Sequence, residues 1–212
     1  MRSRDLLPEE RRAVFALTSR LLQYPDEDVI GHLLLLMETA RELPQPAGAP
    51  LSRFLASMGE SSLLGLQSEY VATFDLRRRN CLYLTYYLNG DTRRRGMALW
   101  RFQDAFRQRG LSVVGGELPD FLPVLLELAA VGHEDIALAL LIEHQQGIDV
   151  LRQALEAAAS PYADIVRALE VALPEPSAAV RAAALTLAAE GPPAEQVGLE
   201  PFFPVESLRV RS

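Results

Sequence analysis

Apolar residues recur along most of this chain at spacings of three and four, which is the period of an amphipathic helix. Val14, Leu17 and Leu21 set the pattern in the first such stretch. No segment alternates apolar and polar residues as a half-exposed β-strand would. Helices are predicted over residues 8–24, 29–40, 51–58, 62–74, 91–109, 121–131, 133–146, 148–158, 160–172 and 177–190.

The predicted fold is therefore all-α, a single-domain helical bundle of about nine or ten helices. Residues 1–173 are assigned to this helical domain. A break at Pro174 and Pro176 follows, and residues 174–212 are expected to form a C-terminal extension that is partly helical and partly flexible or disordered. A chain of 212 residues is long enough to bury one sizeable core.

Proline and glycine mark the expected connections between helices. Pro25 ends the first helix, and the segment Leu43–Pro50, which holds three prolines and a glycine, is predicted to be a loop. Gly110 ends the helix that begins after Asp91, and Val113–Gly116 is expected to act as a flexible hinge because it closes on two glycines.

Composition and charge exclude several classes of function. The chain is 49% hydrophobic and 23% charged, as in ordinary soluble proteins. Its formal net charge of −7 argues against nucleic-acid binding and favours a partner with a basic segment. The longest apolar runs fall short of the roughly 20 residues of a membrane span, and the N-terminus lacks an apolar signal segment. With a single cysteine, the chain is expected to be cytoplasmic and not inserted in a membrane.

Motifs for catalysis or metal binding are absent from the sequence. It has no glycine-rich phosphate loop, no nucleophile elbow and no His-Glu-x-x-His pair. His133, Glu134 and Asp135 are consecutive, so on a helix their side chains would point in different directions. Cys81 lies among aromatic residues and is expected to be a small buried hydrophobe. We therefore expect neither an enzyme nor a metal site.

The segment Glu69–Gly96 concentrates the aromatic residues of the chain and joins two predicted helices. Tyr70 and Phe74 fall on the apolar face of the first helix, which favours a place in the core. The triple Tyr83, Tyr86 and Tyr87 fits either the core or the rim of a groove, because a tyrosine hydroxyl requires a polar partner or water.

Two arginine triplets, Arg77–Arg79 and Arg93–Arg95, flank this aromatic connection. They are expected to pair with nearby carboxylates or, alternatively, to meet an anionic partner or a phosphate-bearing cofactor. Three consecutive residues on a helix cannot all face one ligand. The candidate cofactor-binding residues are Arg77, Arg78, Arg93 and Arg94.

Asp120 and Glu127 are seven residues apart at a strongly apolar predicted helix, which would place both on one side of it. A carboxylate is costly to bury without a partner, so Glu127 is expected either to pair with an arginine triplet or to line a groove. In the second case the groove would receive a basic amphipathic peptide, with its apolar face on the aromatic residues.

Four segments resemble the signature of the NarJ-type nitrate reductase assembly chaperones, in the TorD/DmsD-like family of molybdoenzyme chaperones. They are Glu69–Arg79, Leu82–Tyr87, Gly90–Met97 and Glu117–Pro123. The last resembles the Glu-x-Pro-Asp-His element of that family, with Phe121 in the place of the histidine. The polar contact of that histidine is therefore absent here.

The resemblance implies an all-helical chaperone without catalytic activity. Its implied partner is the N-terminal segment of the respiratory nitrate reductase catalytic (alpha) subunit, held until the molybdopterin guanine dinucleotide cofactor is inserted and before membrane docking. Proteins of cofactor biosynthesis are further implied partners, and the client, not the chaperone, is implied to hold the cofactor permanently. Asp120 corresponds to a binding-associated aspartate of the family, and Tyr70 and Phe74 to its aromatic pair.

From the resemblance and the pattern together, the expected peptide-binding residues are Tyr70, Phe74, Tyr83, Tyr86, Tyr87, Asp120, Phe121 and Glu127. The alternative is a carrier that binds the molybdenum cofactor itself through the arginine triplets.

Overall fold

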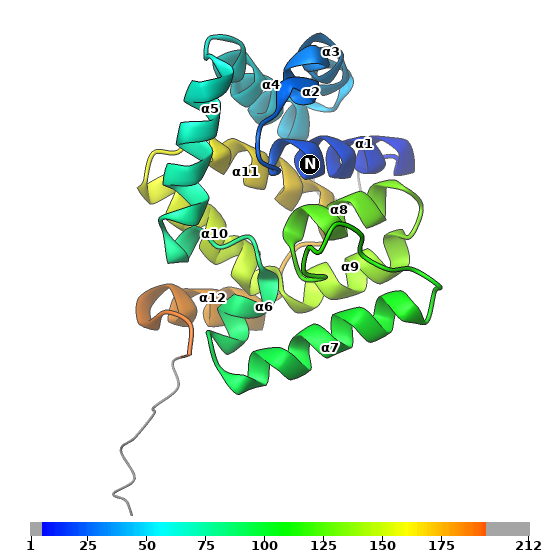
Figure 1. The fold of residues 1–212 in the computed structure, drawn as a ribbon, viewed down its shortest axis with the longest axis vertical. Coiled ribbons are helices and arrows are strands. Elements are labelled where there is room, and N and C mark those ends of the chain that lie inside the picture. Colours follow the sequence, from blue (N-terminus) through cyan, green and yellow to red (C-terminus); the bar gives the residue numbers. More distant parts are fainter. Residues whose placement is uncertain (1–5, 194–212) are drawn as a thin grey trace, which may run out of the picture.

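The computed structural model describes residues 6–193, which form an all-α bundle of twelve α-helices (Figure 1). A π-helical turn, Val71–Asp75, extends α5, and a 3-10 turn, Arg78–Asn80, precedes α6. The helices are α1 Pro8–Leu21, α2 Glu27–Gly31, α3 Leu33–Glu42, α4 Gln45–Gly59, α5 Leu63–Tyr70, α6 Leu84–Asn89, α7 Arg93–Arg107, α8 Leu122–Ala130, α9 Glu134–Glu143, α10 Gln145–Ala157, α11 Tyr162–Ala172 and α12 Ala178–Glu190.

The all-α prediction is confirmed, and two short helices explain why the count exceeds nine or ten. The second predicted helix is two helices, because the chain turns at His32 between α2 and α3. The aromatic connection contains α6, which its Tyr and Leu content did not mark as a helix. The expected tail beyond residue 193 lies outside the described residues.

The loop predicted at Leu43–Pro50 is wrong, since α4 already begins at Gln45. Pro46 lies in the first turn, where a backbone N–H has no partner within the helix and its absence costs nothing. Pro50 lies deeper in α4 and is buried, so packing outweighs the one hydrogen bond that its ring removes.

Helix α1 lies at the centre of the bundle. It packs on α8, α11 and α3, and Figure 1 shows it between the α3–α4 pair and the α8–α9 pair. Val14 and Phe15 are completely buried in its core-facing side. Ser19 donates a hydrogen bond of 2.8 Å to the carbonyl of Pro123 and so ties α1 to the start of α8.

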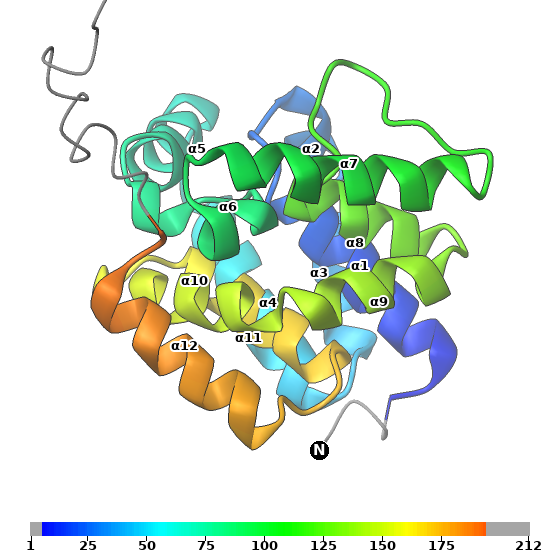
Figure 2. The ribbon, with the colours of Figure 1, turned by 90° about the horizontal axis from the view of Figure 1, so that it is seen from below.

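The remaining helices form the outer parts of the body. α4 packs on α3 and α11, and α12, which falls in the predicted C-terminal extension, packs on α10 and buries Ala184 completely. Figure 2 shows α7 and α12 at opposite edges of the body, with α9, α10 and α11 between them. Within residues 6–193, no helix is long and apolar enough to cross a membrane, and no group of three or more His, Cys, Asp or Glu side chains could hold a metal ion.

An ion cluster joins α10 to α11. The Arg152 guanidinium contacts Asp149 at 2.6 Å, Glu156 at 2.7 Å and Glu170 at 3.0 Å. Three carboxylates thus share one arginine. Burial, reinforced by the two neighbouring carboxylates, raises the pKa of Glu170 to about 7.

This cluster predicts a pH dependence of stability. Because the folded state holds the Glu170 proton more tightly than the unfolded chain does, Glu170 should lower the free energy of unfolding as pH rises from about 4.5 to about 7. Replacing it by glutamine should remove that decline. Urea unfolding of both proteins at pH 5 and pH 8 checks this. The free energy of unfolding of Glu170→Gln minus that of the parent should be larger at pH 8 than at pH 5. An identical difference at both pH values would contradict the assignment.

Candidate functional site

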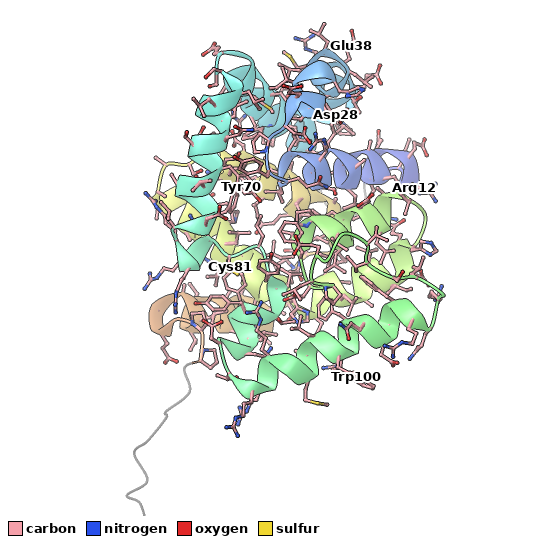
Figure 3. The ribbon with its side chains drawn as sticks, in the orientation of Figure 1. Arg12, Asp28, Glu38, Tyr70, Cys81 and Trp100 are labelled. Carbon is pink, nitrogen blue, oxygen red and sulfur yellow. The ribbon has the colours of Figure 1, made fainter. Side chains whose placement is uncertain are left out.

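A groove of about 710 Å³ opens on the face between α5 and α8. Tyr70 and Cys81, labelled in Figure 3, come from the two segments that form one side of it. The other side comes from the loop before α8 and the start of that helix. The groove is lined by Gln23, Tyr24, Tyr70, Phe74, Asp75, Arg78, Cys81, Leu82, Tyr83, Tyr86, Asp91, Arg95, Glu117, Phe121, Pro123 and Val124.

The end of α5 and the π-helical turn that extends it present two of these rings, Tyr70 and Phe74. After Tyr70 the helix widens into a π-helical turn, in which the Leu76 N–H donates to the carbonyl of Val71, five residues earlier, at 3.1 Å. The Tyr70 and Phe74 ring centres are 4.8 Å apart, and both pack on Tyr162 of α11. Tyr70 also donates to the Leu22 carbonyl at 3.2 Å. Both residues are at least 92% buried, so they belong to the core and present only a small part of their surface to the groove.

A short backbone bridge joins the two sides. Tyr83 and Phe121 pair antiparallel, with Leu84 N–H bonding the Asp120 carbonyl at 3.0 Å and Leu122 N–H bonding the Leu82 carbonyl at 2.8 Å. The Tyr83 and Phe121 ring centres lie 5.2 Å apart. Both side chains are half-buried, and together they form an apolar surface inside the groove.

Tyr83 also joins this apolar surface to the charged rim. Its hydroxyl donates to Glu117 Oε1 at 2.9 Å, and the Arg95 guanidinium lies 5.8 Å from its ring centre. Burial, with the hydrogen bond to Glu117, raises the pKa of Tyr83 far above its ordinary value. The hydroxyl is therefore a fixed donor that holds Glu117 at the groove.

The rim carries both signs of charge. Asp91 lies 3.6 Å from Arg78 and 3.4 Å from Arg95, so one arginine of each triplet reaches the same carboxylate. Asp75 and Glu117 add two further carboxylates to the lining. An apolar floor with a mixed rim suits a peptide that has an apolar face and charged flanks.

Five of the predicted peptide-binding residues line the groove, and Tyr87 does not. Tyr70, Phe74, Tyr83, Tyr86 and Phe121 form part of its wall. The Tyr87 side chain is completely enclosed, and its hydroxyl bonds the carbonyls of Arg79 and Cys81 at 3.0 and 2.9 Å. Two backbone carbonyls inside the protein thus supply the polar partner that the Tyr87 hydroxyl requires, so this tyrosine does not need a place at the rim of a groove.

The expected carboxylate pair is not a pair in the structure. Asp120 is 0% exposed and lies behind the groove wall, where its Oδ2 accepts from the backbone N–H and the hydroxyl of Thr85 at 3.1 and 2.6 Å. Glu127 is exposed on α8, outside the groove lining. The seven-residue spacing failed because Asp120 precedes the helix, so helical periodicity does not relate the two positions.

Of the arginine candidates, Arg78 alone lines the groove. Arg77 is exposed beside the end of α10, and Arg93 and Arg94 are exposed on the first turn of α7. The triplets therefore do not converge on one phosphate-sized site. Arg95 and Glu117 were missed as groove residues, although Arg95 stands four residues after Asp91 in a helical start, a spacing that favours an ion pair.

Comparison with known proteins gives a consistent set of relatives. The family model described as nitrate reductase delta subunit matches residues 40–167. The nitrate reductase-like protein NarX of Mycobacterium tuberculosis is 38% identical over 156 residues, which cover 74% of this chain and only 24% of that protein. The probable nitrate reductase molybdenum cofactor assembly chaperone NarJ of Bacillus subtilis is 30% identical, over 77% of this chain and 90% of that one.

Two further comparisons extend this set. The NarJ assembly chaperone of Escherichia coli K12 is 33% identical over 117 residues, 54% of this chain and 50% of its own length. A crystal structure of an Archaeoglobus fulgidus protein assigned to redox enzyme maturation superposes with a TM-score of 0.56 at 24% identity, covering 75% of this chain and 91% of that one. This last likeness concerns the fold.

Proposed function

This chain belongs to the nitrate reductase delta subunit family, and on that premise we propose that it is a cytoplasmic chaperone for the catalytic (alpha) subunit of a respiratory nitrate reductase. Two of these relatives, from Bacillus subtilis and Escherichia coli, are named as nitrate reductase molybdenum cofactor assembly chaperones. In this proposal the chain binds the N-terminal segment of the catalytic subunit. It holds that subunit competent for molybdenum cofactor insertion until the subunit docks at the membrane.

The groove is the observation that carries this proposal. Its floor offers the Tyr83 and Phe121 rings to the apolar face of an amphipathic segment, and Asp75 and Glu117 offer carboxylates to basic flanking residues. A chaperone must release its client, so an affinity near micromolar, about −8 kcal/mol, suffices. Burying a few aliphatic side chains at roughly 25 cal/mol per Å² supplies this after the cost of ordering the segment.

A direct carrier of the molybdenum cofactor has less support from the structure. In that alternative the arginine triplets would direct their guanidinium groups at the phosphates of the cofactor. The two arginines that do converge, Arg78 and Arg95, flank Asp91, whose charge repels a phosphate. We therefore propose that the client, and not this chain, binds the cofactor.

Calorimetric titration tests the proposal. A peptide of the first residues of the nitrate reductase catalytic subunit should bind with saturation and more weakly at higher salt, because the rim charges attract its basic residues. Glu117→Gln should weaken binding severalfold and reduce the salt dependence. Glu127→Gln, which removes an equal charge outside the groove, should leave both unchanged.

Two results would count against the proposal. Equal effects of the two glutamine substitutions would show that the groove is not the binding site. No peptide binding at all, together with binding of the isolated pterin nucleotide, would favour the carrier.

A further inference from the structure

Asp120 is too deeply buried to contact a bound peptide directly. It corresponds to the aspartate expected to meet the client, yet it is 0% exposed and does not line the groove. Its Oδ2 accepts two hydrogen bonds from Thr85, and its Oδ1 has no hydrogen-bond partner among residues 6–193. A buried carboxylate with an unsatisfied oxygen is costly. The hydrogen bonds of its side chain all lead to Thr85, which is therefore the residue through which the carboxylate can act on the groove.

The hydroxyl of Thr85 links Asp120 to a groove residue, Arg95, through two hydrogen bonds. This hydroxyl has one proton, which it donates to Asp120 Oδ2 at 2.6 Å. Its oxygen then accepts from Arg95 Nε at 3.3 Å. The negative charge of Asp120 polarises the hydroxyl and makes its oxygen a better acceptor. Asp120, Thr85 and Arg95 therefore form a chain of hydrogen bonds that runs from the interior to the groove.

Arg95 ends this chain in a fixed position. Besides Thr85, its guanidinium meets Asp91 through Nη1 at 3.4 Å and faces the Tyr83 ring at 5.8 Å. Its side chain is 22% exposed and lines the groove. No hydrogen bond of its Nη2 is found within the described part of the chain, and a guanidinium offers five N–H donors in a rigid fork.

We propose that Asp120 is a positioning residue that acts through Thr85 to fix Arg95, and that Arg95 contacts the client by donating to a main-chain carbonyl or a carboxylate of the bound segment. This inference rests on the proposed function and adds a specificity contact to it. It assigns the client contact to Arg95 and removes it from Asp120.

A purely structural role for Asp120 makes a different prediction. Asp120 also caps the first turn of α6 by accepting from Thr85 N–H. Asparagine is as good a cap as aspartate, so Asp120→Asn should keep the cap while it removes the charge. Thr85→Val removes the hydroxyl and keeps nearly the same side-chain size, whereas Thr85→Ser keeps the hydroxyl. These three variants separate the hydrogen-bond chain from the packing.

The test combines peptide titration with NMR of the Arg95 Nε–H group. We expect Asp120→Asn, Thr85→Val and Arg95→Ala each to weaken binding of the client peptide about tenfold, which is about 1.4 kcal/mol. Thr85→Ser should stay within about twofold of the parent. In the Arg95→Ala background, neither Asp120→Asn nor Thr85→Val should weaken binding further, because all three break the same chain. The Nε–H resonance should shift in Asp120→Asn and Thr85→Val and not in Thr85→Ser.

Three outcomes would overturn the inference. Additive losses in the Arg95→Ala background would mean that Asp120 acts on the client by another route. An unshifted Nε–H resonance in Asp120→Asn would mean that the chain does not fix Arg95. Absence of peptide binding by the parent protein would overturn the client contact and the proposed function together, whereas the first two results leave the proposed function standing.

Discussion

Alanine at both Tyr83 and Phe121 should weaken binding of the client segment roughly 100-fold. These two rings form the apolar surface of the groove and pack 5.2 Å apart at the backbone bridge. Losing about 100 Å² of apolar contact with the client at roughly 25 cal/mol per Å² corresponds to about 2.5 kcal/mol, which is close to 100-fold in affinity. Calorimetric titration of the double variant with the client peptide measures the loss.

Trp100→Ala is the matched control for this prediction. Trp100 is a larger aromatic residue, 50% exposed, and Figure 3 shows it on the outer side of α7, away from the groove. Its removal should leave the affinity for the peptide unchanged. A greater loss for Trp100→Ala than for the double variant would place the binding site on α7.

Alanine at Gly48 should lower the free energy of unfolding by about 3 kcal/mol. A Cβ at this position would lie 2.5 Å from the Ala40 carbonyl oxygen and 2.8 Å from that of Leu43, where the end of α3 crosses the start of α4. Backbone oxygens cannot turn aside as a side chain can, so the two helices must separate, at the upper end of the usual cost of overpacking. Thermal unfolding should show a Tm lower by about 6–12 °C.

Gly96→Ala is the same substitution in an open site. Gly96 lies in α7, and nothing beyond its own helix backbone lies within 4 Å of the position that a Cβ would take. Alanine there should raise stability by up to about 1 kcal/mol, because it favours the helix and restricts the unfolded chain. If both variants lost stability equally, the close approach of α3 and α4 at Gly48 would be the wrong explanation.

The all-α fold could be predicted from the sequence because helical periodicity is a local property. Helices such as α1 and α11 carry apolar residues at regular spacing, and their bounds were predicted to within a few residues. The sequence predicts a shorter α4 because prolines usually interrupt helices, although the first turn of a helix tolerates them. α6 was missed because six residues are too few to show a period.

The site was predictable in its location and not in its details. The aromatic connection lines one side of the groove through Tyr83 and Tyr86, and whether a client binds there stays a prediction. The exclusion of Tyr87 depends on the carbonyls of Arg79 and Cys81, which only the folded chain brings to its hydroxyl. Likewise, the burial of Asp120 follows from the bridge to the aromatic connection, a contact between segments that the sequence does not relate.

That bridge also determines when the protein acquires its groove during synthesis. The Tyr83 side of the groove leaves the ribosome well before the Phe121 side, and α1 meets its partners α8 and α11 later still. Chains are made from the N-terminus, and domains fold as units once enough of them has emerged. A nascent chain therefore has no groove, and the proposed capture of a client can begin only in one late step of its own translation.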